Sequence, residues 1–433
     1  MRRRMVRPVV ILALVAALPG MAVAQKGPVT DALGFSPDRL ARLDRFMQQY
    51  VDSNRVAGAV GLVLRDGKAA YTRAVGWADR ESGRRMTSDV IFRIASQSKA
   101  ITSTAVLMLV EEGKIALDDP VSRFIPAFGK TLVASRADSG RTSVPAKRQI
   151  TIKDLLTHTA GISYGTDGLV AQRYAAQGLG PAAGWGWYTA DKDEPICTSM
   201  ERLASLPFVA QPGDAWVYGY NIDILGCVVE RASGQALDEF VRARITAPLG
   251  MRDTYFFLPA SKRARLATVY MNDSTGHAVR APDGPRGQGN YVDGPRRSFA
   301  GGAGLVSTAA DYAVFLEMIR NHGALHGVRY LSPKMVDLMI TNQVGSLYGS
   351  PGQGFGLGFA TTERLGTDGL ASVGSFGWGG AYGSNYKVDP AEHLVIVFML
   401  NQLPNSSDIG AKFPNLVYQA LSDARAGAGV VQR

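Results

Sequence analysis

The sequence has only two cysteines and five histidines in 433 residues. So few cysteines exclude a fold held together by disulfides, although an oxidising compartment permits one bridge between Cys197 and Cys227. Because Cys227 lies in an apolar run, we expect it to be a buried free thiol instead. His322 and His326 are four residues apart, but glycines follow both and no carboxylate completes a set, so no metal site is predicted.

Dense basic clusters and membrane-length apolar runs are also scarce. The net charge is +10 at pH 7, with 47 basic against 37 acidic residues. Since the basic residues are scattered, we expect no nucleic-acid binding. The apolar run at 8–18 is shorter than the roughly 20 residues of a spanning helix. Because arginines precede it and Ala22-Val23-Ala24 follows, we predict a signal peptide over 1–24, and an exported, periplasmic or secreted protein without a lasting membrane anchor.

The remaining sequence predicts a large globular α/β protein, since 46% of the residues are hydrophobic. Helical spacing and apolar strand-like runs are distributed unevenly along it. We predict strands at 58–64, 69–75, 355–359, 384–388 and 394–400. We predict helices at 37–51, 98–110, 152–156, 200–206, 222–231, 237–245, 309–320 and 415–425. This order favours an antiparallel sheet built from both ends of the chain, with a mainly helical insertion.

Ser96 and Lys99 form a Ser-x-x-Lys motif at the start of the helix predicted over 98–110. A spacing of three residues places both side chains on one helix face, with the lysine nitrogen beside the hydroxyl. The free N–H groups and the dipole of a helix N-terminus favour an oxyanion there. We therefore take Ser96 as the candidate nucleophile and Lys99 as its proton acceptor. The motif alone is weak evidence, because most Ser-x-x-Lys pairs are solvated surface residues.

Five sequence blocks give the motif a context. They are Phe92-Arg93-Ile94-Ala95-Ser96-Gln97-Ser98-Lys99, the segments 152–161 and 247–254, Gly301-Gly302-Ala303-Gly304-Leu305, and 376–383. With them, nearly the whole chain after residue 24 resembles the serine beta-lactamase-like and penicillin-binding-protein superfamily. The resemblance is to class C-like members, and in particular to the family VIII carboxylesterases.

This resemblance implies a beta-lactamase/DD-peptidase-like fold. Its antiparallel sheet would be flanked by terminal helices in a discontinuous α/β domain of residues 25–95 and 300–433. Residues 96–299 would form the helical domain, with the active site at the interface. The resemblance also implies an acyl-enzyme on the serine, no cofactor, and a small-molecule ester as the partner.

The family's second catalytic element is a tyrosine after a Pro-Gly pair, and Pro212-Gly213 places Tyr218 there. A free phenol is a poor base at neutral pH, but a neighbouring lysine ammonium favours its ionised form. We therefore expect Lys99 and Tyr218 to act as one proton-relay unit. Which of the two is the base stays open, because coupled groups titrate as a pair.

Two departures from the beta-lactamase pattern bear on the substrate. Tyr220 stands where those enzymes have the Asn of Tyr-x-Asn, and Asn221 comes one place late. Trp378 replaces the Lys of Lys-Thr-Gly, which binds a substrate carboxylate. Its loss removes a charge-assisted hydrogen bond of about 1.5–3 kcal/mol. An uncharged ester loses nothing by this change, so esters are favoured over beta-lactams.

By resemblance, the Ala381 amide would form an oxyanion hole with the Ser96 amide. The glycines before it suit that use, because a side chain there would keep the ester carbonyl away from the backbone. The predicted oxyanion and substrate-binding residues are Ala381, Trp378, Gly379, Gly380 and Tyr220.

The functional prediction is a serine hydrolase that cleaves esters of small to medium acyl chains through an acyl-enzyme on Ser96. A beta-lactamase or D-alanyl-D-alanine carboxypeptidase/transesterase on the same scaffold is the alternative, and a non-enzymatic binding module is the third hypothesis. Gly161-Ile162-Ser163-Tyr164-Gly165 matches the nucleophile elbow of another hydrolase fold. That elbow needs a strand before it and a helix after it. Since a helix is predicted before it and a loop after it, Ser163 is not expected to be the nucleophile.

Overall fold

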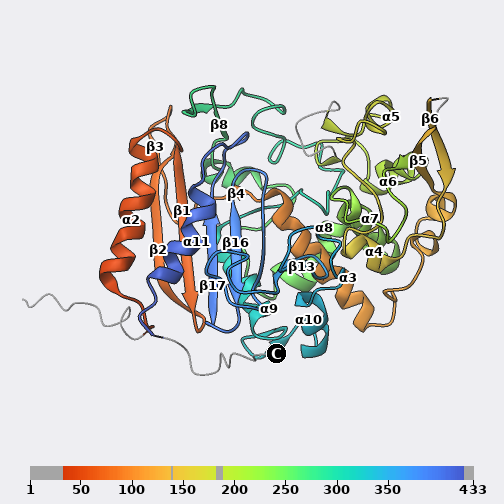
Figure 1. Cartoon of the computed structure of the whole chain (residues 1–433). Helices are drawn as coiled ribbons and strands as arrows, with labels where there is room; N and C mark the ends of the chain where they lie inside the picture. Colours follow the sequence, from red (N-terminus) through yellow and green to blue (C-terminus); the bar gives the residue numbers. More distant parts are fainter. Residues whose placement is uncertain (1–32, 138–139, 182–188, 424–433) are drawn as a thin grey trace, which may run out of the picture.

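An eight-stranded sheet forms the centre of the structure (Figure 1). The computed structural model describes residues 33–137, 140–181 and 189–423, so the predicted signal peptide lies outside the described residues. The strand order is β13-β14-β15-β16-β17-β1-β2-β3, and every neighbouring pair is antiparallel. The bounds are β1 Gly58–Arg65, β2 Lys68–Asp79, β3 Arg84–Arg85, β13 Gln353–Phe355, β14 Ala360–Thr362, β15 Phe376–Gly379, β16 Asn385–Asp389 and β17 Leu394–Met399.

The two ends of the chain meet at the pairing of β1 with β17, where Val60 lies opposite Met399. Both strands are apolar on both faces, which is the composition of a central strand covered on each side. The predicted sheet from both ends of the chain is therefore confirmed. The single strand predicted at 355–359 is wrong, because β13 ends at Phe355 and the chain turns before β14. Gly358 adopts a φ of +106° in that turn, which favours glycine.

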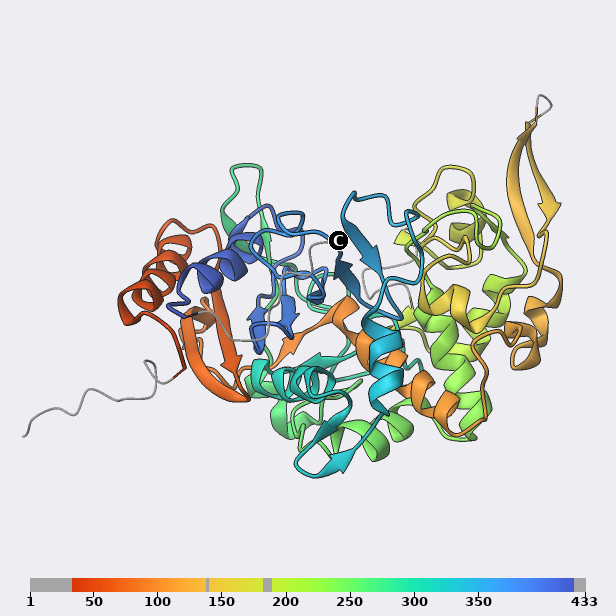
Figure 2. The same cartoon turned by 60° about the horizontal axis from the view of Figure 1, so that its bottom comes forward.

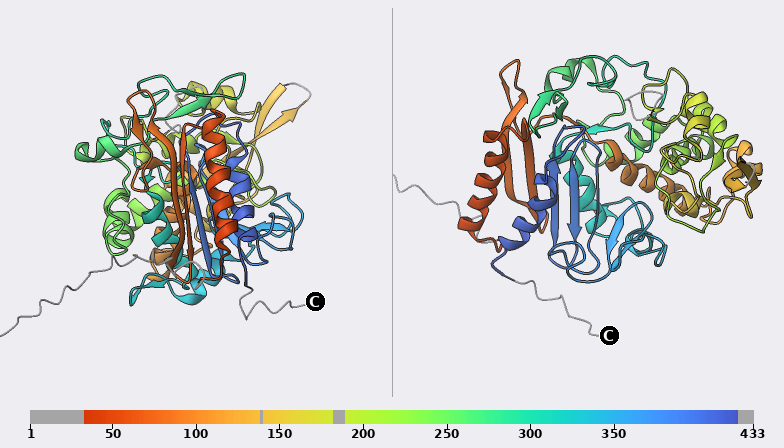
Figure 3. Two further views of the ribbon diagram at one scale, coloured as in Figure 1. Left: turned by 90° about the vertical axis from the view of Figure 1, so that its left-hand side faces the viewer. Right: turned by 45° about the horizontal axis from the view of Figure 1, so that its top comes forward.

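Helices cover both faces of the sheet (Figures 1 and 3). One face packs against α2 (Pro37–Asp52) and α11 (Ile409–Gln419), and the other packs against α9 (Ala309–Arg320) and α3 (Ser98–Glu111). The last helix was expected at 415–425 but begins and ends earlier, because Ile409, Phe413 and Val417 form the apolar stripe buried on the sheet. The predicted sheet with flanking terminal helices is thus observed.

The middle of the chain is rich in helices, and α3 runs from the sheet into them (Figure 2). These helices are α4 Ile152–Leu156, α5 Ala171–Ala176, α6 Ile196–Ala204, α7 Asn221–Ser233 and α8 Leu237–Val241, and α10 Pro333–Ile340 follows α9 later in the chain. The short helical segments are Ala95–Gln97, Val121–Arg123, Pro126–Lys130, Arg242–Thr246 and Ala260–Arg265. The division into domains at 25–95, 96–299 and 300–433 stays a prediction.

In the described part of the chain, short strands form smaller sheets around this framework. They are β4 Phe92–Arg93 with β10 Val306–Ser307, β5 Leu132–Ala137 with β6 Gly140–Pro145 and β7 Pro207–Phe208, β8 Tyr270–Asn272 with β9 Ala278–Arg280, and β11 Ala324–Leu325 with β12 Val328–Arg329. Within the described part of the chain, no helix combines the length and apolarity needed to cross a bilayer.

The prediction of a free thiol at Cys227 is wrong. Cys197 on α6 and Cys227 on α7 form a disulfide, and their Cα atoms are 5.0 Å apart. That separation lies within the range a bridge requires. The apolar surroundings of Cys227 were read correctly, since both cysteines are buried. The sequence did not show that α6 packs on α7 and brings the two together.

Candidate active site

Ser96 lies in a strained turn at the start of α3. The preceding residue, Ala95, has a φ of +43°, in a region that costs an L-residue about 1–2 kcal/mol. The turn is held because the Ile94 amide donates to Leu305 O at 3.1 Å and the Gln97 amide donates to Ile94 O at 3.0 Å. Strain of this kind clusters at active sites, where the surrounding structure enforces it.

Lys99 is almost completely buried, with 2% of its surface exposed. Its Nζ donates to Ser96 Oγ at 3.2 Å, to Tyr164 Oη at 3.0 Å and to the Gly302 carbonyl at 2.6 Å. An ammonium has three N–H groups, and each finds an acceptor here. The structure therefore places Lys99 beside Ser96 on one helix face, as their spacing predicts.

Tyr218 meets Lys99 through its ring and not through its hydroxyl. The Lys99 Nζ lies 4.7 Å from the centroid of the Tyr218 ring, within the range of a cation–π contact. The Tyr218 hydroxyl accepts a hydrogen bond of 3.1 Å from the Trp378 indole. The three predicted catalytic residues are therefore adjacent. The tyrosine hydroxyl that is bonded to Lys99 belongs to a different residue.

That residue is Tyr164, which sequence reasoning missed. It lies in the Gly-x-Ser-x-Gly segment that suggested Ser163 as an alternative nucleophile. No strand precedes this segment and it runs on as loop, so the elbow context is absent. The Ser163 side chain is buried and its Oγ accepts from the Gly165 amide at 3.1 Å. The signal that could have found Tyr164 was a second tyrosine between flanking glycines after α4.

The loops that carry Tyr164 and Tyr218 cross in direct contact. A Cβ at Gly219 would lie 2.2 Å from the Ile162 carbonyl oxygen, so only glycine permits the crossing. The Asn221 amide ties the two loops together, donating to Ile162 O at 3.3 Å and to Val217 O at 3.2 Å. Asn221 is fully buried, and its amide is used to hold these loops.

A buried histidine supports the Tyr218 ring. The His158 and Tyr218 ring centroids are 4.8 Å apart, and no part of His158 is exposed. Burial, reinforced by the charge of Lys99, lowers the pKa of His158 well below its ordinary 6.5. His158 is therefore neutral at physiological pH. Asn221 Nδ2 lies 2.9 Å from its Nδ1, within hydrogen-bond distance.

The Trp-Gly-Gly block passes directly over the turn that carries the serine. A Cβ at Gly380 would lie 2.5 Å from the Ile94 carbonyl oxygen, so glycine is required there. This close approach brings Ala381, the predicted oxyanion donor, next to the Ser96 turn. Trp378 is half-buried and its ring centroid lies 5.4 Å from that of Tyr218.

Tyr220 lies behind the other tyrosines and is fully buried. Its hydroxyl accepts from the Gly180 amide at 2.8 Å, and its ring packs edge-on against Tyr164 at 4.9 Å between centroids. This placement argues against the predicted substrate contact of Tyr220, because its side chain is used in supporting Tyr164.

Aromatic side chains form one wall beside Lys99. Trp216 stacks on Tyr218 with centroids 5.7 Å apart, and Tyr348 meets Trp216 edge-on at 5.0 Å. These rings and Trp378 are each partly exposed. An arrangement of this kind suits an uncharged, apolar group, since it offers large apolar faces and few polar atoms.

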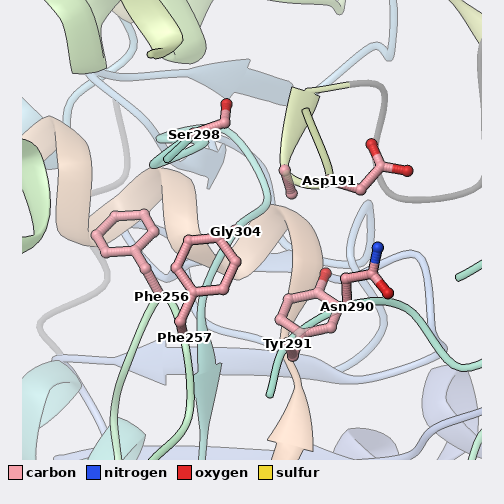
Figure 4. Close-up of a pocket in the computed structure, with 8 residues that line it drawn as sticks. Asp191, Phe256, Phe257, Asn290, Tyr291, Ser298 and Gly304 are labelled. Carbon is pink, nitrogen blue, oxygen red and sulfur yellow. The ribbon is translucent and has the colours of Figure 1, made fainter. Parts of the chain in front are cut away.

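Asp191 lines two hollows in the structure. Figure 4 shows the smaller one, in which the rings of Phe256, Phe257 and Tyr291 gather near Gly304 while the carboxylate of Asp191 is directed away from them. The larger hollow has a volume of 640 Å³ and is also lined by Asp191.

The larger hollow adjoins the predicted oxyanion donor. Its lining includes Ala281, Tyr382 and Leu403, and Tyr382 directly follows Ala381. Ala281 and Tyr382 also pack against Ala95, the residue before the serine. The hollow is therefore one layer of side chains away from Ser96. Among the residues that the structure describes, no group of three His, Cys, Asp or Glu side chains could hold a metal ion.

Comparison with known proteins shows which family the chain belongs to. The sequence profile described as Beta-lactamase matches residues 43–419. The chain belongs to the beta-lactamase family. Esterase EstB of Burkholderia gladioli is 37% identical over 389 residues, which cover 86% of this chain and 93% of EstB. Lovastatin esterase of Penicillium rubens is 30% identical over 346 residues, which cover 78% of this chain and 82% of that protein.

A solved structure has the same fold as this beta-lactamase family member. EstCE1, described as a hydrolase with promiscuous acyltransferase activity, superimposes with a TM-score of 0.74 at 30% identity, covering 89% of this chain and 99% of EstCE1. The predicted beta-lactamase-like fold and the predicted family are therefore confirmed. The roles of the individual site residues stay predictions.

Proposed function

We propose that this protein hydrolyses carboxylic esters of small to medium acyl chains through an acyl-enzyme on Ser96. The observation that carries the proposal is the buried contact of 3.2 Å between Lys99 Nζ and Ser96 Oγ. Trp378, which contacts Tyr218, stands at the position where beta-lactamases carry a carboxylate-binding lysine. The esterases among the relatives support the same reaction class.

In the proposed first step, Ser96 Oγ attacks the ester carbonyl carbon. Its proton passes to the unit formed by Lys99 and the two adjacent tyrosines, Tyr164 and Tyr218. The carbonyl oxygen becomes an oxyanion that the backbone amides of Ser96 and Ala381 stabilise. The bond from carbon to the alkoxy oxygen then breaks, and the alcohol leaves with the proton.

In the second step, water attacks the carbonyl carbon of the acyl-serine and gives its proton to the same unit. The bond to Ser96 Oγ breaks, the serine regains the proton, and the carboxylic acid leaves. An alcohol that enters in place of water would give an ester as product.

The neighbourhood of the serine supports an uncharged substrate. Trp378 can donate one neutral hydrogen bond, and Tyr218 already accepts it. A beta-lactam or a peptide with a C-terminal carboxylate would lack the cation that recognises it. The partly exposed rings of Trp216, Tyr218 and Trp378 offer the ester an apolar surface instead.

We also propose that the protein is exported after cleavage behind Ala24. The basic start followed by a short apolar run supports this. The Cys197–Cys227 disulfide supports it independently, because such bridges persist in oxidising compartments. Mass spectrometry of the protein from its native host would show a chain beginning at Gln25. A full-length chain beginning at Met1 would contradict the proposal.

The direct test of the activity is hydrolysis of p-nitrophenyl butyrate. The substitution Ser96→Ala should abolish it, and Ser163→Ala, the matched control, should leave it within about twofold of the unmodified protein. A fluorophosphonate should label the peptide that contains Ser96. Full activity of Ser96→Ala, or labelling at Ser163, would show that the nucleophile is assigned wrongly.

A further inference from the structure

A buried carboxylate contacts the residue that also accepts a hydrogen bond from Lys99. Asp223 is in the first turn of α7, and 2% of its surface is exposed. Its Oδ1 accepts hydrogen bonds of 3.2 Å from the Gly302 amide and of 3.2 Å from the Thr189 hydroxyl. A buried charge is costly, so a carboxylate kept in such a place calls for a specific reason.

Gly302 connects this carboxylate to Lys99. The amide of Gly302 donates to Asp223, and its carbonyl accepts the 2.6 Å hydrogen bond from Lys99 Nζ. A Cβ at position 302 would lie 2.4 Å from Asp223 Oδ2, so the approach requires glycine. The neighbouring Gly301 carbonyl accepts from Thr102 on α3 at 2.9 Å. The segment is thus clamped between α3 and α7.

The three hydrogen-bond acceptors of Lys99 are all uncharged in their ordinary states. They are a serine hydroxyl, a tyrosine hydroxyl and a backbone carbonyl. A buried ammonium surrounded only by neutral groups is unfavourable. Asp223 supplies a negative charge across the Gly302 backbone. Burial raises the pKa of Asp223 to about 6, and the charge of Lys99 opposes this rise.

We propose that Asp223 is a positioning residue of the Ser96–Lys99 site. It holds Gly302, and through that residue the third hydrogen bond of Lys99, and its charge balances the ammonium. This inference rests on the proposed function, because it assigns Asp223 to the same proton transfer. Asp223 itself does not touch the serine or the substrate.

The titratable groups near Asp223 are those of the Lys99 site. Lys99 on α3 is the charged group that faces Asp223. Around Lys99 lie Tyr164 and Tyr218, and the neutral His158 packs behind Tyr218. Without the negative charge of Asp223, the unit of Lys99, Tyr164 and Tyr218 gives up a proton more readily. Because this unit must accept the serine proton, the site then becomes active at lower pH.

The test uses Asp223→Asn, whose side-chain oxygen can still accept from Gly302. Asp311→Asn is the matched control. Asp311 is a half-buried acid that likewise accepts from a backbone amide, that of Asp253 at 2.7 Å, and from a threonine hydroxyl, that of Thr254 at 3.0 Å. Burial raises the pKa of Asp311 as well, but Asp311 makes no hydrogen bond in the Lys99 network.

The readout is the rate at which a fluorophosphonate labels Ser96 between pH 5 and pH 9, with kcat and KM for p-nitrophenyl butyrate. In Asp223→Asn, the rising limb of the labelling profile should move to lower pH by about one unit. Its kcat should fall by about tenfold while KM stays within twofold. Asp311→Asn should keep the profile of the unmodified protein.

The outcomes distinguish a failure of the proposed function from a failure of the role proposed for Asp223. If the unmodified protein is not labelled at Ser96, the proposed function is wrong. If it is labelled and Asp223→Asn keeps the same profile, the role of Asp223 is wrong. If Asp223→Asn does not fold, Thr189→Val makes the same test. This substitution removes one hydrogen-bond donor to the Asp223 carboxylate, so a smaller fraction of the carboxylate is charged at a given pH. The rising limb of the labelling profile should therefore shift in the same direction.

Discussion

The hydroxyl of Tyr164 offers the sharpest test of how the Ser96 site moves a proton. It accepts the 3.0 Å hydrogen bond from Lys99, and both side chains are buried. A hydrogen bond to a charged group contributes about 1.5–3 kcal/mol. If this bond persists in the transition state, Tyr164→Phe should lower kcat/KM by about 10- to 150-fold, since 1.4 kcal/mol corresponds to a factor of ten.

The expected effect of Tyr218→Phe depends on whether the Tyr218 hydroxyl orients the ring or accepts the proton. Its hydroxyl is bonded to the Trp378 indole, a neutral hydrogen bond of about 0.5–1.5 kcal/mol. If that bond only orients the ring, kcat/KM should fall by about 2- to 10-fold. If Tyr218 is the proton acceptor, the loss should reach about 10²- to 10⁴-fold. The pair of variants therefore decides which tyrosine the Lys99 unit uses.

The assay is the initial rate of p-nitrophenyl butyrate hydrolysis over a range of concentrations at pH 7.5, with the melting temperature of each variant recorded. Tyr174→Phe is the control, because the Tyr174 hydroxyl is buried and has no hydrogen-bond partner among the described residues. It should leave the rate unchanged. If Tyr164→Phe keeps more than half of the activity, the assignment of the Lys99–Tyr164 bond to catalysis is refuted.

Three further predictions concern the surroundings of the site. Trp378→Phe removes the indole N–H that binds Tyr218, so kcat/KM should fall by about 2- to 10-fold with stability little changed; an unchanged rate would mean that the bond does not orient Tyr218. Replacing Cys197 and Cys227 by serine opens a loop of sequence separation 30 and should lower the free energy of unfolding by about 3.5 kcal/mol in urea titrations. The unmodified protein with its disulfide reduced should then unfold at the midpoint of that variant, and equal midpoints with and without the disulfide would contradict this. In the fold, the pKa of Asp223 is raised from 3.8 to about 6. The stability that its carboxyl group contributes is therefore present below pH 3.8 and lost as the pH rises through about 6. Asp223→Asn removes this pH-dependent loss of stability. The variant should therefore gain up to about 3 kcal/mol over the unmodified protein between pH 4 and pH 8, and a constant difference across that range would contradict the burial argument.

Local pattern determined a large part of the fold. The helix 98–110, the strands at 58–64 and 394–400 and the helix at 309–320 follow from apolar spacing, and the structure has each within a few residues. The pairing of Ser96 with Lys99 is equally local, because a helix brings residues three apart onto one face. The family and its fold were readable from several blocks together, since each block occupies its own place along the chain.

Only the tertiary structure decided how loops that are far apart in the sequence contact one another. Tyr164 and Tyr218 are 54 residues apart, and nothing in either loop states which hydroxyl will reach Lys99. The crossing at Gly219 decides it, because the loops pass within contact distance there. The same reason explains the disulfide between α6 and α7 and the contact of Asp223 with Gly302. The sequence determines local geometry and residue chemistry, whereas long-range packing decides which partner each polar group finds.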